Sequence, residues 1–192
     1  DKKGDFHYDI VSAFIKSIRG SDPNAAVYWL ARMIEAGEDI AFIARRMLIL
    51  AAEDVGIANP TALVIANNTF QAIKTVGNPE GRILLSECAI YLASSPKSNK
   101  AYRAIDLAIE KVKKTGNLQV PMHLRNASTK LMKDLGYGKG YEYAHDFKNE
   151  FTFQEFLPEE ISGTKFYEPG ENPKENSIRD FLKNRWKSKY DY

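Results

Sequence analysis

Glycines alternate with other residues at 136–140, where the sequence reads Gly-Tyr-Gly-Lys-Gly. Such a cluster can suggest a phosphate-binding loop. A P-loop, however, needs its lysine and a serine or threonine directly after the last glycine, between a strand and a helix. Here Gly140 is followed by Tyr141, and the segment follows a predicted helix. We interpret it as a helix stop and turn. No Walker A motif occurs elsewhere, so we do not expect this chain to hydrolyse ATP by itself.

The other residue types that do chemistry are scattered. The three histidines lie far apart, and no cysteine or carboxylate pair stands at metal-ligand spacing from any of them. The single cysteine falls on the apolar face of a predicted helix, which favours a small buried hydrophobe over a nucleophile. The carboxylate pairs are typical of helix caps or solvent-facing groups. We expect no catalytic residue, no metal site and no cofactor in this chain. The histidines, the cysteine and the carboxylate pairs to which this applies are His7, His123, His145, Cys88, Glu53-Asp54 and Glu159-Glu160.

Basic residues concentrate in one part of the chain. Residues 97–139 hold ten Lys/Arg against three Asp/Glu, whereas residues 142–180 hold four against ten. The basic segment predicts either salt-dependent, sequence-independent contacts to DNA phosphates or a solvated face balanced by the acidic segment. The candidate DNA-contacting residues are Lys97, Lys100, Arg103, Lys111, Lys113, Lys114, Arg125, Lys130 and Lys133.

The elements that position these residues are predicted to be helices. Asx-Pro pairs at Asp22, Asn59 and Asn78 are typical of helix starts, and Gly37 and Gly77 are typical of helix ends. Apolar residues recur at three- and four-residue spacing, and no segment has the alternation of a strand. The pattern predicts helices near 6–19, 23–36, 39–55, 60–76, 79–95, 97–114 and 126–135, and a last helix carrying Ile178, Phe181, Leu182 and Trp186.

The stretch 40–52 is apolar on most sides, which predicts a helix at the centre of a bundle. Arg45 and Arg46 lie within it, and we expect them to form a partly buried ion pair, either within the chain or between subunits. Residues 1–135 are predicted to form a helical core, and because it has more amphipathic and all-apolar helices than a small monomer requires, we expect it to be an oligomerisation core. Residues 136–192 are predicted to form an irregular segment and a final helix that pack on that core. The irregular segment is expected to pack through its aromatics, which are Phe151, Phe153, Phe156, Phe166 and Tyr167.

Composition bounds the cellular setting. One cysteine excludes a disulfide framework, and no apolar run reaches the length of a membrane helix, so a cytoplasmic protein without a membrane partner is expected. The sequence begins at Asp1 without an initiator methionine, and we interpret it as a piece of a longer protein. Helix starts near 22, 39, 59 and 78 leave an α-solenoid for protein interaction as an alternative architecture.

Short runs along nearly the whole chain carry a family resemblance. They include Arg19-Gly20-Ser21-Asp22, Tyr28-Trp29-Leu30-Ala31-Arg32-Met33, Glu53-Asp54-Val55-Gly56, Ala93-Ser94-Ser95-Pro96-Lys97-Ser98-Asn99, Val120-Pro121-Met122-His123-Leu124-Arg125-Asn126-Ala127 and Phe166-Tyr167-Glu168-Pro169. The chain resembles the carboxy-terminal part of the bacterial replication-associated recombination protein A family. These proteins are AAA+ ATPases related to the Werner-helicase-interacting protein and to clamp loaders.

The resemblance implies an all-α domain that follows an AAA+ core and lid, akin to a clamp-loader collar. It implies a homo-oligomer, a tetramer, within a nucleoid-associated, DNA-dependent ATPase that acts at stalled replication forks. Single-stranded-DNA-binding protein is an implied partner of the parent protein. ATP and magnesium would belong to the ATPase module, which this sequence does not contain.

Overall fold

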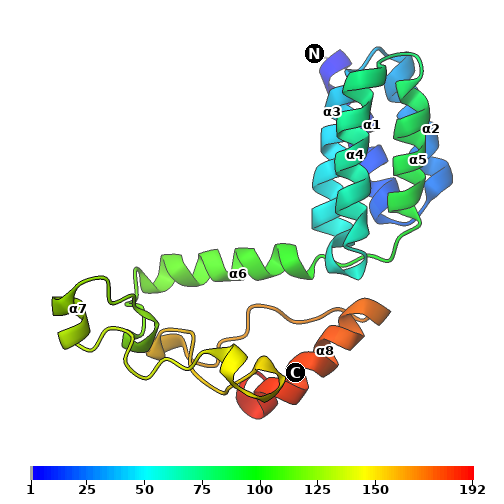
Figure 1. Ribbon diagram of the computed structural model, residues 1–192. Helices are drawn as coiled ribbons and strands as arrows, with labels where there is room; N and C mark the ends of the chain where they lie inside the picture. The colour runs from blue at the N-terminus through cyan, green and yellow to red at the C-terminus, as the bar shows by residue number, and fades with distance from the viewer. Residues whose placement is uncertain (1) are drawn as a thin grey trace. The chain divides into compact units, whose positions relative to one another are not determined.

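The computed structural model describes residues 2–192, with side chains from Gly4 onward, and all regular secondary structure in this range is helical (Figure 1). The all-α prediction is therefore confirmed. The chain forms two compact units. Unit 1 comprises Asp1–Arg103 and Pro169–Asn176, and unit 2 comprises Ala104–Glu168 and Ser177–Tyr192. Among the described residues, no helix combines the length and apolar character needed to cross a membrane.

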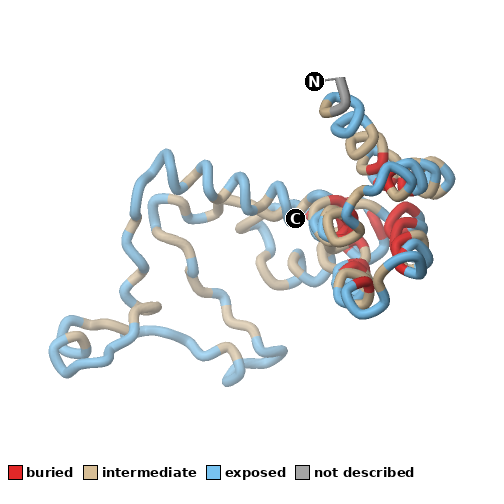
Figure 2. Tube along the Cα trace, turned by 90° about the horizontal axis from the view of Figure 1, so that it is seen from above, coloured by how far each residue is buried: buried red, intermediate tan, exposed pale blue. Residues whose placement is uncertain are grey.

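Unit 1 is a bundle of five helices that run alongside one another (Figure 1). Most of its buried residues, red in Figure 2, lie on these helices, and their apolar side chains form one core because each helix turns one apolar stripe inward. The helices are α1 (Lys2–Arg19), α2 (Pro23–Glu35), α3 (Ile40–Leu50), α4 (Thr61–Val76) and α5 (Gly81–Ala93).

Helix α3 packs against α1, α4 and α5, as its nearly all-apolar sequence predicted. Ile43, Met47 and Leu50 are at most 1% exposed. Each such side chain contributes about 1.5–3 kcal/mol to folding. Ile49 is 41% exposed, so one edge of α3 remains on the surface.

Only some of the predicted caps close their helices. The Asp22 carboxylate accepts from the amide of Ala25 at 3.0 Å, as expected at the start of α2. The prediction for Asn59 was wrong, because Tyr91 on α5 and Ser95 just after that helix offer hydroxyl acceptors nearby. The Asn59 amide donates to Tyr91 Oη at 2.9 Å and Ser95 Oγ at 3.3 Å, joining α4 to α5 instead of capping α4.

The glycine stops were predicted correctly, since Gly37 and Gly77 adopt φ values of 80° and 71°. Asn78, directly after the second stop, does not cap the next helix. Helix α5 begins only at Gly81, and its first turn makes no side-chain capping bond.

An ion pair between the exposed Arg19 and the buried Asp54 lies just after the end of α3. After Leu50 the chain makes a π-helical turn, and Asp54 Oδ1 accepts from Arg19 Nε at 2.9 Å. This hydrogen bond raises the pKa of Arg19. Asp54 is 8% exposed, so the prediction that this acidic residue caps a helix or faces solvent was wrong. Gly56 lies against the Ser98 carbonyl oxygen, which a Cβ atom would approach to 2.8 Å, so the close approach requires glycine there.

Three further helices complete the chain: α6 (Lys100–Thr115), α7 (Lys130–Asp134) and α8 (Pro173–Trp186). Helix α7 begins four residues later than predicted, because the Thr129 hydroxyl accepts from the Met132 amide and sets the cap there. Its end has the double hydrogen bond of a Schellman motif, with Gly136 N to Lys133 O and Tyr137 N to Met132 O. Gly136, Gly138 and Gly140 all have positive φ, so the predicted helix stop and turn is confirmed.

Helix α8 starts from a reciprocal cap in unit 1. The Asn172 side chain accepts from the Glu175 amide at 2.9 Å. In return the fully buried Glu175 carboxylate accepts from Asn172 Nδ2 and from the Gly170 amide, each at 2.9 Å. This arrangement follows the logic of a capping box, and it satisfies a buried charge with two donors.

The reactivity of Cys88 tests the packing of unit 1. Cys88 is fully buried on α5, and burial raises the pKa of its thiol to about 11. We expect Ellman's reagent to label the folded protein at pH 8 at least ~100-fold more slowly than the urea-unfolded protein, because the thiolate is scarce and enclosed. A Cys88→Ser/Ser128→Cys variant, whose thiol lies at an exposed position, provides the control and should react at once. Equally fast labelling of the two folded proteins would contradict this packing.

Candidate functional site

An aromatic cluster anchors unit 2. The Trp186 ring lies 5.2 Å from Phe151, 5.7 Å from Phe153, 6.2 Å from Phe156 and 5.5 Å from Tyr190 between ring centroids, mostly edge to face. The prediction that the irregular segment packs through its aromatics is confirmed for these three phenylalanines. The end of α8 thus fastens a segment that has almost no regular structure of its own.

A charged hydrogen-bond group stands beside this cluster. Glu155 Oε2 accepts from Lys189 Nζ at 2.8 Å and from Ser162 Oγ at 2.5 Å, while Oε1 accepts from the Leu157 amide at 2.8 Å. Partial burial acts to raise the pKa of Glu155, but these donors and the Lys189 charge outweigh it and lower the pKa to about 2. The Lys189 ammonium also lies 5.1 Å from the centroid of the Trp186 ring. The acid therefore serves to hold the segment together.

Unit 2 has no enclosed apolar core. Every one of its residues is at least partly exposed (Figure 2). On the part of α6 that belongs to unit 2, Ile105, Ile109 and Val112 are 45–56% exposed and form an apolar stripe; Tyr102, one turn earlier on the same helix and in unit 1, is 45% exposed. A contiguous apolar surface of this kind marks an interaction site in soluble proteins.

The nine candidate DNA-contacting residues divide between the units. Three lie in unit 1 and six in unit 2. Those of unit 1 are Lys97, Lys100 and Arg103; those of unit 2 are Lys111, Lys113 and Lys114 on α6, Arg125 in the following loop, and Lys130 and Lys133 on α7.

Two of the candidates are already engaged in structural contacts. Lys97 Nζ donates to Ser21 Oγ and to the carbonyl oxygens of Ala93 and Ser95, and burial lowers its pKa. Arg125 Nε donates to the Val120 carbonyl at 2.8 Å. Both side chains hold local backbone conformation, and Lys97 has little freedom left for a phosphate.

The lysines near the end of α6 and on α7 are more available. Lys113, Lys130 and Lys133 are exposed and form no ion pair with any side chain described from Gly4 onward. Lys114 pairs with Glu110 at 3.1 Å, but this exposed pair is worth well under ~1 kcal/mol and is easily exchanged.

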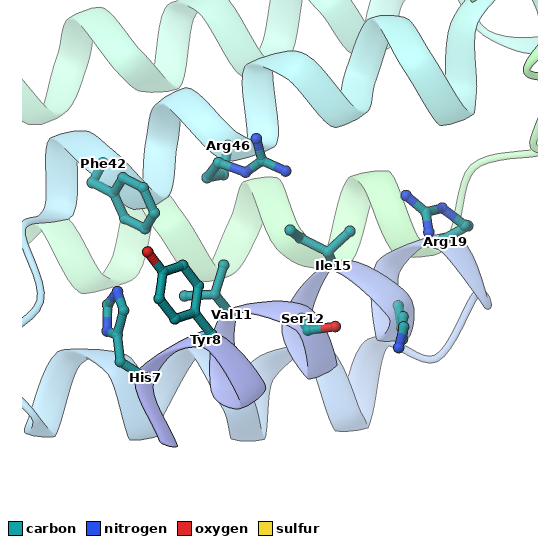
Figure 3. A pocket seen from close by; sticks show the side chains of 9 residues that line it. His7, Tyr8, Val11, Ser12, Ile15, Arg19, Phe42 and Arg46 are labelled. Carbon is teal, nitrogen blue, oxygen red and sulfur yellow. The ribbon is translucent and has the colours of Figure 1, made fainter. Parts of the chain in front are cut away.

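A groove of about 400 Å³ lies between α1 and α3 in unit 1 (Figure 3). Val11, Ile15 and Phe42 contribute apolar lining to it, and Lys16 and Arg46 contribute positive charge. Neither Arg45 nor Arg46 forms an ion pair with a side chain described here, so the predicted pair within the chain was wrong. An ion pair between subunits stays a prediction.

The sequence did not predict the ion pair between Glu155 and Lys189 beside the Trp186 cluster. Glu155 and Lys189 are 34 residues apart, and no periodic pattern links an irregular segment to a helix end. The only signal was compositional: aromatic residues gather at 151–156 and again at 186–192.

Comparison with known proteins decides the relationship. Residues 20–186 match the family described as MgsA AAA+ ATPase C terminal. The chain belongs to this family. A replication-associated recombination protein A from Coxiella burnetii is 43% identical over 183 residues, and the one from Escherichia coli K12 is 45% identical over 183 residues. In both cases the match covers 95% of this chain. The Bacillus subtilis protein of the same name is 46% identical over 174 residues, or 91% of this chain.

The chain spans about two fifths of the length of these relatives, covering 42%, 41% and 41% of them. The chain thus corresponds to the carboxy-terminal domain of the MgsA family, as the short sequence runs predicted.

The pH dependence of unit 2 tests the role of Glu155. Because its folded pKa of about 2 lies below the ordinary value near 4.3, its contribution is complete above pH ~5 and is lost as pH falls toward 2. Glu155→Gln should lower the free energy of unfolding at pH 7 by about 1–2 kcal/mol, since a partly exposed pair is screened. It should also flatten the acid dependence.

Trp186 fluorescence in a Trp29→Phe background reports this unit alone, because the chain has two tryptophans. Glu160→Gln, at an exposed acid in the same segment, is the matched control and should behave like the parent chain. A parallel loss of stability with acid in the Glu155 variant and the control would refute the role assigned to Glu155.

Proposed function

We propose that this chain is the non-catalytic assembly module of a longer AAA+ ATPase and that it joins copies of that protein into a homo-oligomer, a tetramer as the family resemblance implies. The observation that carries the proposal is the apolar surface of unit 2. This unit encloses no apolar side chain completely, yet it presents many at its surface. Apolar surface left open in one chain is covered at an interface in oligomeric proteins.

The α6 stripe suits a helix partner from a second copy. Tyr102, Ile105, Ile109 and Val112 follow the 3-4-3 spacing of a two-helix seam. Ala101 and Ala108 flank the stripe on one side, and such small side chains let two helix backbones approach closely. This spacing supports a second copy as the partner, because the same face of another α6 can pair with it.

The parent protein is proposed to act in DNA replication and recombination at stalled forks, as a cytoplasmic, nucleoid-associated ATPase. Its ATP and magnesium would be held by the ATPase module, outside this chain. Three bacterial relatives are named for replication-associated recombination, which supports this setting. Single-stranded-DNA-binding protein is proposed as a partner of the parent protein.

Light scattering of this chain tests the assembly. We expect a mass near four times the 21.7 kDa of one chain, independent of dilution over the micromolar range. Replacing Ile105 and Ile109 together with glutamine should dissociate it, because both side chains would place amides in an apolar interface. Helical circular dichroism should not change, since both residues are surface-exposed in the single chain.

The matched control is Arg103→Gln with Glu110→Gln. It makes the same number of glutamine changes on the far side of the same helix and leaves net charge unaltered. This variant should keep the parent mass. If the unmodified chain were a 21.7 kDa monomer at every concentration, the assembly proposal would be wrong.

A second candidate function is contact with DNA through the basic segment. The exposed, weakly engaged lysines at 113, 114, 130 and 133 favour it. Their charges suit phosphate binding without sequence readout.

Charge reversal tests the second candidate. Changing Lys111, Lys113 and Lys114 to glutamate should weaken binding to a forked or single-stranded oligonucleotide. It should also reduce the slope of log affinity against log salt by about 2, because each lost phosphate contact removes about 0.7 for a single strand. Reversal of Lys148, Lys174 and Lys187, which are exposed elsewhere, is the control. Equal weakening by both triple variants would mean a general charge effect and no defined DNA surface.

A further inference from the structure

Unit 2 contains a hollow of about 440 Å³ that none of the proposed roles uses. The loop 123–127 forms one side, and Gly138 and Tyr141 of the glycine turn form another. Phe156, from the segment that packs on Trp186, completes the lining. Three stretches far apart in sequence therefore meet around one cavity.

The loop side of the hollow is held in place before any ligand arrives. His123 Nε2 lies 2.7 Å from the Glu155 carbonyl oxygen, which ties the loop to the anchored segment. Arg125 donates to the Val120 carbonyl and to Gln119 Oε1, and its guanidinium lies 5.1 Å from the centre of the Tyr137 ring. A pre-formed wall lowers the ordering cost of binding.

The glycine turn is held against the same loop. The Gly138 amide donates to the Met122 carbonyl oxygen at 2.9 Å. Gly138 has a φ of 78°, and a Cβ atom there would lie 3.2 Å from the Arg125 carbonyl oxygen. Only glycine allows the turn to lie this close to the Arg125 carbonyl oxygen. The same turn places Tyr141 at the hollow.

The chemistry of the lining suits a flat, partly polar ring. Tyr141 and Phe156 are 49% and 47% exposed, so their rings remain open to stacking. Asn126 is exposed and makes no hydrogen bond with another described side chain, which leaves an amide donor and acceptor for a base edge. Aromatic rings, an amide and a nearby guanidinium are the groups with which proteins hold unpaired nucleobases.

Basic residues adjoin the lining stretches in the sequence. Lys139 is next to Gly138, and Lys130 follows Ala127 by three residues; both are exposed. Glu142, the nearest acid in the sequence to Tyr141, has its carboxylate bonded to the Thr152 hydroxyl. The surroundings therefore favour a ligand that carries phosphate.

We propose that this hollow receives one unpaired nucleobase of a single-stranded nucleic acid. Tyr141 and Phe156 stack on the base, Asn126 contacts its edge, and Lys130 and Lys139 bind the flanking phosphates. Paired bases in a duplex cannot enter, because their faces are covered by neighbours. The inference rests on the DNA-contacting function proposed above and adds to it a preference for unpaired strand.

Fluorescence anisotropy with this chain and a labelled thymidine oligonucleotide of about 20 nucleotides tests the inference. Tyr141→Ala should weaken binding about tenfold, while Tyr141→Phe, which keeps the ring, should bind like the parent chain. The salt slope should stay the same in Tyr141→Ala, because no charge is removed. A strand of abasic sites should bind the parent chain and Tyr141→Ala alike.

A uridine oligonucleotide measured in parallel determines whether DNA or RNA binds more tightly. Tighter binding of either single strand than of its duplex supports the pocket.

A fluorescent 2-aminopurine in the strand reports stacking directly. Its emission should fall on binding to the parent chain and to Tyr141→Phe, and remain high with Tyr141→Ala. Trp186 fluorescence in the Trp29→Phe background confirms that unit 2 of each variant is folded.

The possible results distinguish a failure of the nucleobase pocket from a failure of the proposed DNA-contacting function. If Tyr141→Ala binds the strand as tightly as the parent chain while the Lys111, Lys113 and Lys114 reversal weakens it, the pocket proposal fails and the DNA surface stands. If the parent chain binds no strand even at low salt, both fail. If Tyr141→Ala loses a partner protein but keeps the strand, the hollow is a peptide site and the proposal is overturned.

Discussion

The contact between Trp186 and the phenylalanines of the irregular segment is the constraint on which unit 2 depends. Residues 147–168 have almost no regular secondary structure, so side-chain contacts hold their conformation. The Trp186 ring contacts Phe151, Phe153 and Phe156 in turn, and Lys189 adds a charged bond to Glu155 one residue before Phe156. Because the Glu155 carbonyl also contacts His123, the same anchor reaches the loop on the other side of the unit.

The two units are stabilised in different ways. Unit 1 buries its apolar side chains between helices. Among its buried polar residues, Asp54 accepts from Arg19 through Oδ1 while its Oδ2 has no hydrogen-bond partner, and Glu175 accepts from the Gly170 amide and from Asn172. Unit 2 keeps its apolar side chains at the surface and relies on rings and charge-assisted bonds. A bundle of the first kind is complete by itself. A unit of the second kind gains most from a partner, which is consistent with an assembly role.

Helix content and the main helix limits followed from the sequence, because capping residues, glycine stops and three-four periodicity are local signals. Asp22, Gly37 and Gly77 behaved as their types predict. Asn59 did not, since its choice between a helix cap and the hydroxyls of Tyr91 and Ser95 depends on how α4 and α5 pack. The same limit applies to the site. Arg125 and the lysines were visible as a basic run, but the meeting of Asn126, Tyr141 and Phe156 around one hollow depends on tertiary structure.

The chain does not complete one unit before it starts the other. It leaves unit 1 after Arg103, builds most of unit 2, returns to unit 1 for Pro169–Asn176, and only then supplies the final helix with Trp186 and Lys189. During synthesis unit 1 can bury its bundle early, while unit 2 must wait for the last sixteen residues to emerge. A polypeptide that stops short on the ribosome would thus carry a well-packed bundle and an unfinished second unit. A copy whose synthesis stops before Ser177 would lack Trp186 and Lys189, and with them the side chains that fasten the irregular segment.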